Sequence, residues 1–137
     1  MRRSMIVLVA ILMALTLGAQ VASAGNPHFV RVSAERQGDS LVVSFKEAGL
    51  GNEDQVHIVV SATAACVNRG GNKPSAENKQ SVSAAGDFPV QNGRAQGTLT
   101  LTPTFQPRCS PPMTIEFTNV TITDETSGIS RNLTGTF

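Results

Sequence analysis

The chain has 137 residues, with 11 Lys or Arg against 10 Asp or Glu and a formal net charge of +1. Near neutrality argues against wholesale binding of nucleic acid, and the absence of Trp and Tyr removes the usual stacking platforms for sugars and single strands. Thr, Ser, Val and Gly are abundant and long helix-forming runs are missing, which favours an all-β fold.

Residues 1–24 have the three-part layout of a secretory signal peptide. The parts are, in chain order, the basic pair Arg2 and Arg3, the apolar run Met5–Leu17, and the small-residue cleavage site Ala22-Ser23-Ala24. The apolar run is shorter than the roughly 20 residues that a membrane span needs. We therefore predict a single mature domain over residues 25–137, which is secreted and has no stable membrane anchor after cleavage.

The only two cysteines, Cys66 and Cys109, each lie where a β-rich run meets a loop rich in Pro, Gly and Asn. Export would place them in an oxidising space, where a disulfide persists. Such a bond would close a loop of about 43 residues and stabilise the domain by at most about 4 kcal/mol. This is a large share of the roughly 5–15 kcal/mol expected for the whole domain.

The first three strands are predicted at residues 29–34, 40–46 and 55–64, because apolar residues alternate with polar ones there. The inward residues are expected to be Val30, Val32 and Ala34, then Leu41, Val43 and Phe45, then Val56, Ile58, Val60 and Ala62. His57 falls on the polar face of the third strand, where an exposed histidine is ordinary.

Asn92-Gly93 is a strong signal for a two-residue hairpin turn of type I′. It predicts that residues 81–90 and 94–102 pair with each other as one hairpin. In that register Phe88 opposes Gly97, and a large ring over a glycine suits a twisted sheet.

Four prolines in residues 103–112 exclude a central strand there. The next strand is predicted at residues 113–123, where Ile115 and Phe117 are one step out of phase with Val120 and Ile122. A β-bulge near Thr118-Asn119 would reconcile the two halves. The last strand is predicted after residue 128, and its free edge could pair with a second chain.

Seven strands at this spacing predict an immunoglobulin-like β-sandwich with one disulfide, with a jelly roll or small barrel as the alternative. In such a sandwich the third and sixth strands are antiparallel neighbours. Cys66 at the end of one and Cys109 before the other would then lie at the same end of the domain.

The predicted topology gives the two ends opposite charge. One end would carry Arg69, Lys73, Lys79 and Arg108, with Glu77 as the only acid, and is a candidate binding surface for an anionic partner. The other end would carry Glu53, Asp54, Asp124 and Glu125, which is either a weak calcium site or a solvated loop tip.

Catalytic motifs are missing from the sequence. There is no Gly-x-Ser-x-Gly elbow and no His-x-x-x-His or Cys-x-x-Cys spacing, and both cysteines are expected in the disulfide. We therefore expect no enzyme and no cofactor. The proline-rich loop around Pro107-Arg108-Cys109 is the one feature that suggests a protease inhibitor, because rigid exposed loops lower the entropic cost of binding.

Several segments resemble a family of small exported proteins of Gram-positive, actinomycete-type bacteria. The segments are Ser44–Gly51, Ala65–Pro74, Asn78-Lys79, Cys109–Pro112, Thr118–Val120 and Gly135–Phe137. The resemblance implies export and one disulfide and adds no catalytic residue. We expect a secreted, non-enzymatic binding or envelope-associated module for an unknown extracellular partner; the alternative is a secreted protease inhibitor.

Overall fold

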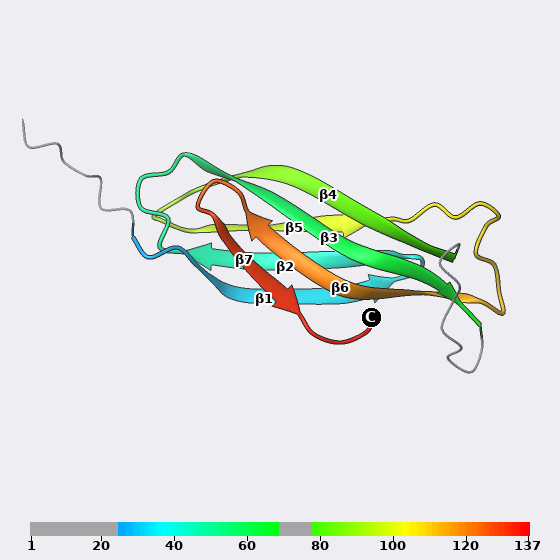
Figure 1. Ribbon diagram of the computed structural model, residues 1–137. Coiled ribbons are helices and arrows are strands. Elements are labelled where there is room, and N and C mark those ends of the chain that lie inside the picture. The colour runs from blue at the N-terminus through cyan, green and yellow to red at the C-terminus, as the bar shows by residue number, and fades with distance from the viewer. Residues whose placement is uncertain (1–24, 69–77) are drawn as a thin grey trace, which may run out of the picture.

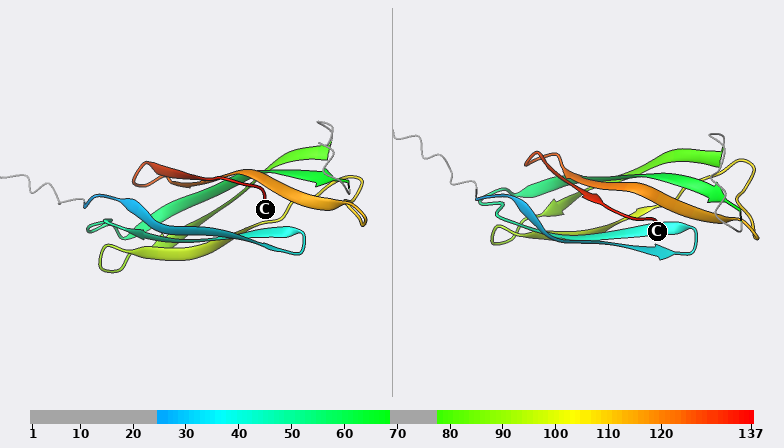
Figure 2. Two further views of the ribbon diagram at one scale, coloured as in Figure 1. Left: turned by 90° about the horizontal axis from the view of Figure 1, so that it is seen from below. Right: turned by 60° about the horizontal axis from the view of Figure 1, so that its bottom comes forward.

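The computed structural model describes residues 25–68 and 78–137, and in them seven antiparallel β-strands form two stacked sheets. The strands are β1 (His28–Gln37), β2 (Ser40–Ala48), β3 (Gln55–Val67), β4 (Lys79–Pro89), β5 (Ala95–Leu101), β6 (Thr114–Asp124) and β7 (Ile129–Leu133). One sheet has the order β1-β2-β5 and the other β4-β3-β6-β7 (Figure 1). Edge-on views show the two layers of an elongated sandwich (Figure 2), so the predicted all-β sandwich is confirmed. The signal peptide predicted for residues 1–24 lies outside the described residues.

The core is built by the period-two alternation of β2, β3 and β6, because alternate residues of a strand point to the same side. All of the inward positions predicted for β2 and β3 are buried. The core residues of these three strands are Leu41, Val43, Phe45, Val56, Ile58, Val60, Ala62, Ala64, Cys66, Ile115, Phe117, Val120 and Ile122.

The predicted hairpin is wrong in its pairing. The Asn92-Gly93 turn forms, with positive φ at both residues, but only the bridge between Gln91 and Arg94 links the two arms. Beyond the turn the arms part: β4 pairs with β3, and β5 pairs with β2. The turn therefore joins the two sheets, because β4 pairs with the edge of β3 and β5 pairs with the edge of β2.

The N-terminal strand departs from its predicted phase at Val30. The register shifts between Phe29 and Arg31, so Val30 is the extra residue of a β-bulge. Phe29 is 5 % exposed and Val30 is 58 % exposed, whereas Val32 and Ala34 face the core as predicted. Prediction of Val30 as an inward residue was thus wrong, because strict alternation misses a bulge.

The bulge predicted in β6 is confirmed. Ser61 pairs with Thr121 and Thr63 pairs with Thr118, so two residues of β6 stand opposite Ala62 alone. Asn119 has φ 53°, in the left-handed region that Asn tolerates better than most residues. The bulge brings both halves of β6 into phase with the core.

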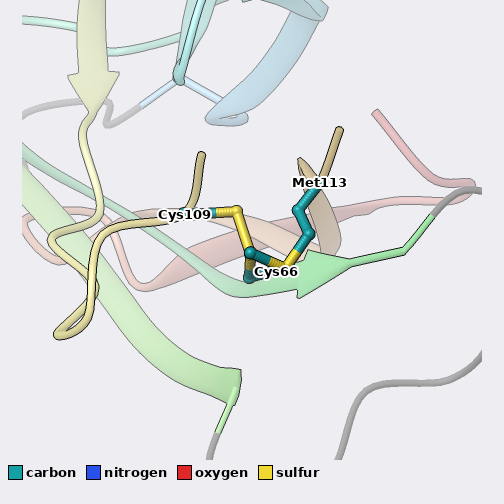
Figure 3. Close-up of a disulfide and its surroundings, with 3 residues drawn as sticks. All are labelled: Cys66, Cys109 and Met113. Atoms are coloured by element: carbon teal, nitrogen blue, oxygen red, sulfur yellow. A yellow bond between two sulfur atoms is a disulfide. The ribbon is translucent and has the colours of Figure 1, made fainter. Parts of the chain in front are cut away.

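The sandwich has two distinct ends. At the disulfide end, Cys66 and Cys109 are bonded with a Cα–Cα distance of 5.8 Å. The sulfur of Met113 lies 3.8 Å from that of Cys66 (Figure 3). The disulfide thus ties β3 to the loop before β6, as predicted. The β2–β3 loop, the β4–β5 turn and the β6–β7 turn gather at the other end, which we call the opposite end (Figure 1).

The C-terminal segment covers part of the edge at β6. After β7 ends at Leu133, Phe137 exchanges two backbone hydrogen bonds of 3.0 Å with Phe117. The segment therefore continues along β6, and the free edge of the sheet is shared between β7 and these last residues.

Candidate functional site

An open depression of about 740 Å³ lies at the opposite end, against β1, β2 and the β4–β5 turn. The residues that matter for its character are His28, Val30, Lys46, Glu47, Arg94 and Gln96. In size it falls within the range of small-molecule sites.

Local structure explains how the side chains reach the depression. The β1 bulge turns Val30 out of the core and onto its rim. Lys46 is exposed because it alternates with the buried Phe45. Arg94 is exposed where it closes the turn, since its N–H donates to Gln91 O at 3.0 Å and its carbonyl accepts from Gln91 N at 2.8 Å.

The charge of the depression is positive. Lys46 and Arg94 are exposed cations, and in the described part of the chain neither forms a salt bridge. His28 is also exposed and donates from Nδ1 to the carbonyl of Asn26 at 2.7 Å. The only acid in the lining is Glu47, which is 1 % exposed. This lining therefore suits a ligand that carries an anionic group next to an apolar group.

Glu47 belongs to a buried acid pair that spans the two sheets. It stands near the end of β2 in one sheet, while Asp124 ends β6 in the other. Asp124 is 0 % exposed, and its Oδ1 accepts hydrogen bonds from the N–H groups of Thr126 at 2.8 Å and Ser127 at 3.1 Å. Both oxygens of Glu47 and Oδ2 of Asp124 are buried, and within the described residues no N–H or hydroxyl group donates a hydrogen bond to them.

The pKa of the Glu47 carboxyl is raised to about 8, mainly by burial and in smaller part by hydrogen bonding and charge repulsion with Asp124. At neutral pH Glu47 is therefore mainly protonated and uncharged. A neutral Glu47 does not offset the positive charges of Lys46 and Arg94 in the depression.

A second polar cluster lies on the outer face of the four-stranded sheet. His57 of β3 donates from Nδ1 to Oδ1 of Asp87 at 2.7 Å, and its Nε2 is 3.7 Å from Oε2 of Glu125. The hydrogen bond with Asp87 raises the pKa of His57; lost solvation opposes this, and the charges of Asp87 and Glu125 add to it. The prediction of His57 as an exposed strand histidine is consistent with a side chain that is 42 % exposed.

The disulfide end presents Arg108 on an exposed loop. Arg108 lines three shallow hollows of about 320, 240 and 310 Å³ around this loop. One of them also includes Arg36 and Asp39, which the β1–β2 turn brings to this end. Asp39 is thus an acid that the predicted charge of this end did not include. Arg69, Lys73 and Glu77, predicted for the same surface, lie outside the described residues.

The four acids predicted at the opposite end do not gather into one ligand set. Glu53, Asp54 and Glu125 are exposed, whereas Asp124 is buried and faces Glu47. The described residues include no group of three or more His, Cys, Asp or Glu side chains that could hold a metal ion. Placing Asp124 in an exposed loop was wrong, because β6 runs one residue further than predicted.

Sequence reasoning missed Val30, Lys46, Glu47 and Arg94 as site residues. A signal for Glu47 was present: one more step of the β2 alternation places it inward after Phe45. A signal for the bulge at Val30 was also present, since Phe29 is one step out of phase with Val32 and Ala34.

No family model, curated protein or solved structure matches the chain. Within residues 25–68 and 78–137, no helix is long and apolar enough to cross a membrane.

Proposed function

We propose that this protein is a secreted, non-enzymatic binding module of the cell exterior or envelope, which takes an anionic group of its partner in the depression at the opposite end. The observation that carries the proposal is that Lys46 and Arg94, which form no salt bridge within residues 25–68 and 78–137, lie with the exposed Val30 in one hollow of about 740 Å³. An anion there gains two charge-assisted contacts, while apolar surface beside them is covered.

The non-enzymatic character is supported by the state of the cysteines. Cys66 and Cys109 are the only cysteines of the chain and form the disulfide, so no thiol is free to act as a nucleophile. The disulfide also supports export, because such bonds persist in oxidising compartments. The strand orders β1-β2-β5 and β4-β3-β6-β7 support an immunoglobulin-like classification. The proposal also includes that the protein is one of the small exported proteins of Gram-positive, actinomycete-type bacteria.

A binding experiment with defined polymers tests the proposal. Purified protein is sedimented with isolated peptidoglycan, with and without its covalently attached phosphate-bearing polymers. Lys46→Gln combined with Arg94→Gln should weaken retention on the phosphate-bearing material at least tenfold, and added salt should do the same. The matched control is Lys79→Gln with Arg108→Gln, which removes two cations from the disulfide end. Equal binding by both double variants would refute the depression as the site.

Intact mass of the secreted protein tests export. A mass that begins at Gly25, with two alkylated cysteines only after reduction, is the expected result. The residue expected at the new N-terminus, Gly25, packs against the backbone of Gly49: a β-carbon added to Gly25 would be 2.7 Å from the Gly49 oxygen. A mature chain that begins at another residue would overturn the predicted cleavage site.

Protease inhibition is the second candidate function. The observation that favours it is that Arg108 is exposed while the adjacent Cys109 is 9 % exposed and held by the disulfide. Such a support limits the motion of the loop and so lowers the entropic cost of binding. The test is residual activity of trypsin- and subtilisin-type proteases with the protein and with Arg108→Ala. Inhibition that disappears in the variant would favour this function over the depression.

A further inference from the structure

The buried acid pair of Glu47 and Asp124 is not used by the proposed binding function, and its position calls for a physical role. The two carboxyl groups come from different sheets, stand near the ends of β2 and β6, and interact with each other at the opposite end. Asp124 is 0 % exposed, and Glu47 is 1 % exposed although it belongs to the floor of the depression, so both carboxyl groups have lost almost all of their hydration. Two ionised carboxylates in such a place would be strongly unfavourable, because each would lose its hydration beside a like charge.

The surroundings of Glu47 are apolar. Its cross-strand neighbours are Phe29 of β1 and Ala95 of β5, both buried. His28 and Lys46, its ionisable neighbours on β1 and β2, are exposed, and Arg94 beside β5 is exposed too. Among the residues that the structure describes, Asp124 is the one charged group that acts on the Glu47 carboxyl.

Apolar residues also surround Asp124 in its own sheet, where its cross-strand neighbours are Ile58 of β3 and Ile129 of β7. The nearest ionisable group on β3 is His57, whose side chain contacts Asp87 and Glu125 on the outer face. The charged residue of β7 is Arg131, whose guanidinium donates to the carbonyl of Phe29 at 2.7 Å.

A proton fits the unpartnered oxygens better than a metal ion does. The N–H groups of Thr126 and Ser127 occupy Oδ1 of Asp124, which leaves three carboxyl oxygens free. A calcium ion takes six to eight oxygens, and no further acid, His or Cys completes a set within the described residues. One proton on Glu47, donated to Oδ2 of Asp124, satisfies an oxygen on each side and removes one of the two charges.

We propose that Glu47 and Asp124 share one proton across the two sheets, and that this proton acts as a latch which holds the opposite end closed in mildly acidic solution and loosens it as the solution turns alkaline. Loosening breaks the O–H bond of the Glu47 carboxyl, and the proton passes to a water or hydroxide of the solvent. The resulting carboxylate repels Asp124 and gains hydration if the end opens.

The turn after Asp124 carries the change to the surface. Oδ1 of Asp124 holds the amides of Thr126 and Ser127, and Oγ1 of Thr126 accepts from the N–H of His57 at 2.9 Å. The N–H of Glu125 donates to the carbonyl of His57 at 2.9 Å. When the acid pair separates, this turn is therefore the first element expected to lose its hydrogen bonds.

Amide hydrogen exchange of the turn tests the latch in the intact folded protein. Wild type is compared with Glu47→Gln at each pH, which cancels the intrinsic pH dependence of exchange. Relative to the variant, opening at Thr126 and Ser127 in wild type should increase about tenfold per pH unit between about pH 5 and about pH 7. The matched control is Glu53→Gln, an exposed acid of the same end, which should retain the wild-type slope.

A direct measurement keeps the proposal testable if Glu47→Gln does not fold. Side-chain carbon NMR of Glu-labelled protein should show one protonated glutamate at pH 7, which is retained in Glu53→Gln. A Glu47 carboxyl that is ionised at pH 6, or an exchange slope that Glu47→Gln leaves unchanged, would overturn the shared proton. So would stabilisation by calcium that is lost in Glu47→Gln, because the free oxygens would then bind a cation.

Discussion

The ring of Phe88 in β4 lies directly on Gly97 of β5, although the two strands belong to different sheets. A β-carbon on Gly97 would overlap the ring. Phe88 also meets Phe45 edge to face, with ring centroids 5.0 Å apart and planes at 84°. The ring thus packs between the layers at the side where β4 and β5 are both edge strands, and only glycine leaves room for it.

Gly97→Ala should lower the free energy of unfolding by about 1–3 kcal/mol, because the added methyl group forces the Phe88 ring out of its place. Gly86→Ala is the matched control, since its β-carbon would be 3.3 Å from Leu99 and Phe88 and asks for only a small shift. Denaturant unfolding measures both. Equal destabilisation by the two substitutions would contradict the specific role of Gly97.

Replacing both cysteines, Cys66→Ala with Cys109→Ala, should lower the free energy of unfolding by up to about 4 kcal/mol. The bond joins residues 43 apart, so it removes much freedom from the unfolded chain. Denaturant unfolding with and without a reductant provides the check. Wild type should respond to the reductant and the double variant should not; a double variant as stable as wild type would show that the bond contributes little.

Asp87→Asn should lower the pKa of His57, because a neutral amide oxygen replaces the carboxylate that accepts the hydrogen bond and attracts the protonated ring. Glu125→Gln should lower it less, since that carboxylate is 3.7 Å away. Ring-proton NMR titrations measure both. Because the pKa of His57 is higher in the folded protein, the protonated ring stabilises the fold. This stabilisation is fully present below about pH 6.5 and is lost as the pH rises through the folded-state pKa. A larger effect of Glu125→Gln would reverse the assignment.

Asn119→Ala should destabilise the domain by about 1 kcal/mol, because alanine tolerates the left-handed conformation poorly. Asn119→Gly keeps the freedom that φ 53° requires and should remain close to wild type. Thermal or denaturant unfolding of the pair separates backbone strain from loss of the side chain. If alanine and glycine behave alike, the β6 bulge does not constrain this residue.

Alternation predicted the core correctly because the direction of a strand side chain is a local property of the extended backbone. Leu41, Val43 and Phe45 are buried for this reason, and so is the out-of-phase pair in β6 once the bulge is counted. The phase failed at Val30, because strict alternation was applied to β1 although Phe29 is one step out of phase with Val32 and Ala34.

Contacts between the two layers followed from packing and could not be predicted from pairing rules. Phe88 and Gly97 were expected to face each other as hairpin partners, and they do meet, but across the sandwich. The turn signal at Asn92-Gly93 fits both a hairpin within one sheet and a connection between the two sheets. What decided the outcome is that β3 and β2 each offered an edge, and pairing there buries more apolar surface than a lone hairpin would.

The sequence by itself determined an all-β chain, the inward faces of β2, β3 and β6, and the two cysteines available for one bond, because these depend on composition and on short-range alternation. Only the tertiary structure decided the depression around Val30, Lys46 and Arg94 and the meeting of Glu47 with Asp124. Those side chains come from different strands or sheets, and their burial, charge and proton affinity arise only when the layers stack and exclude water between them.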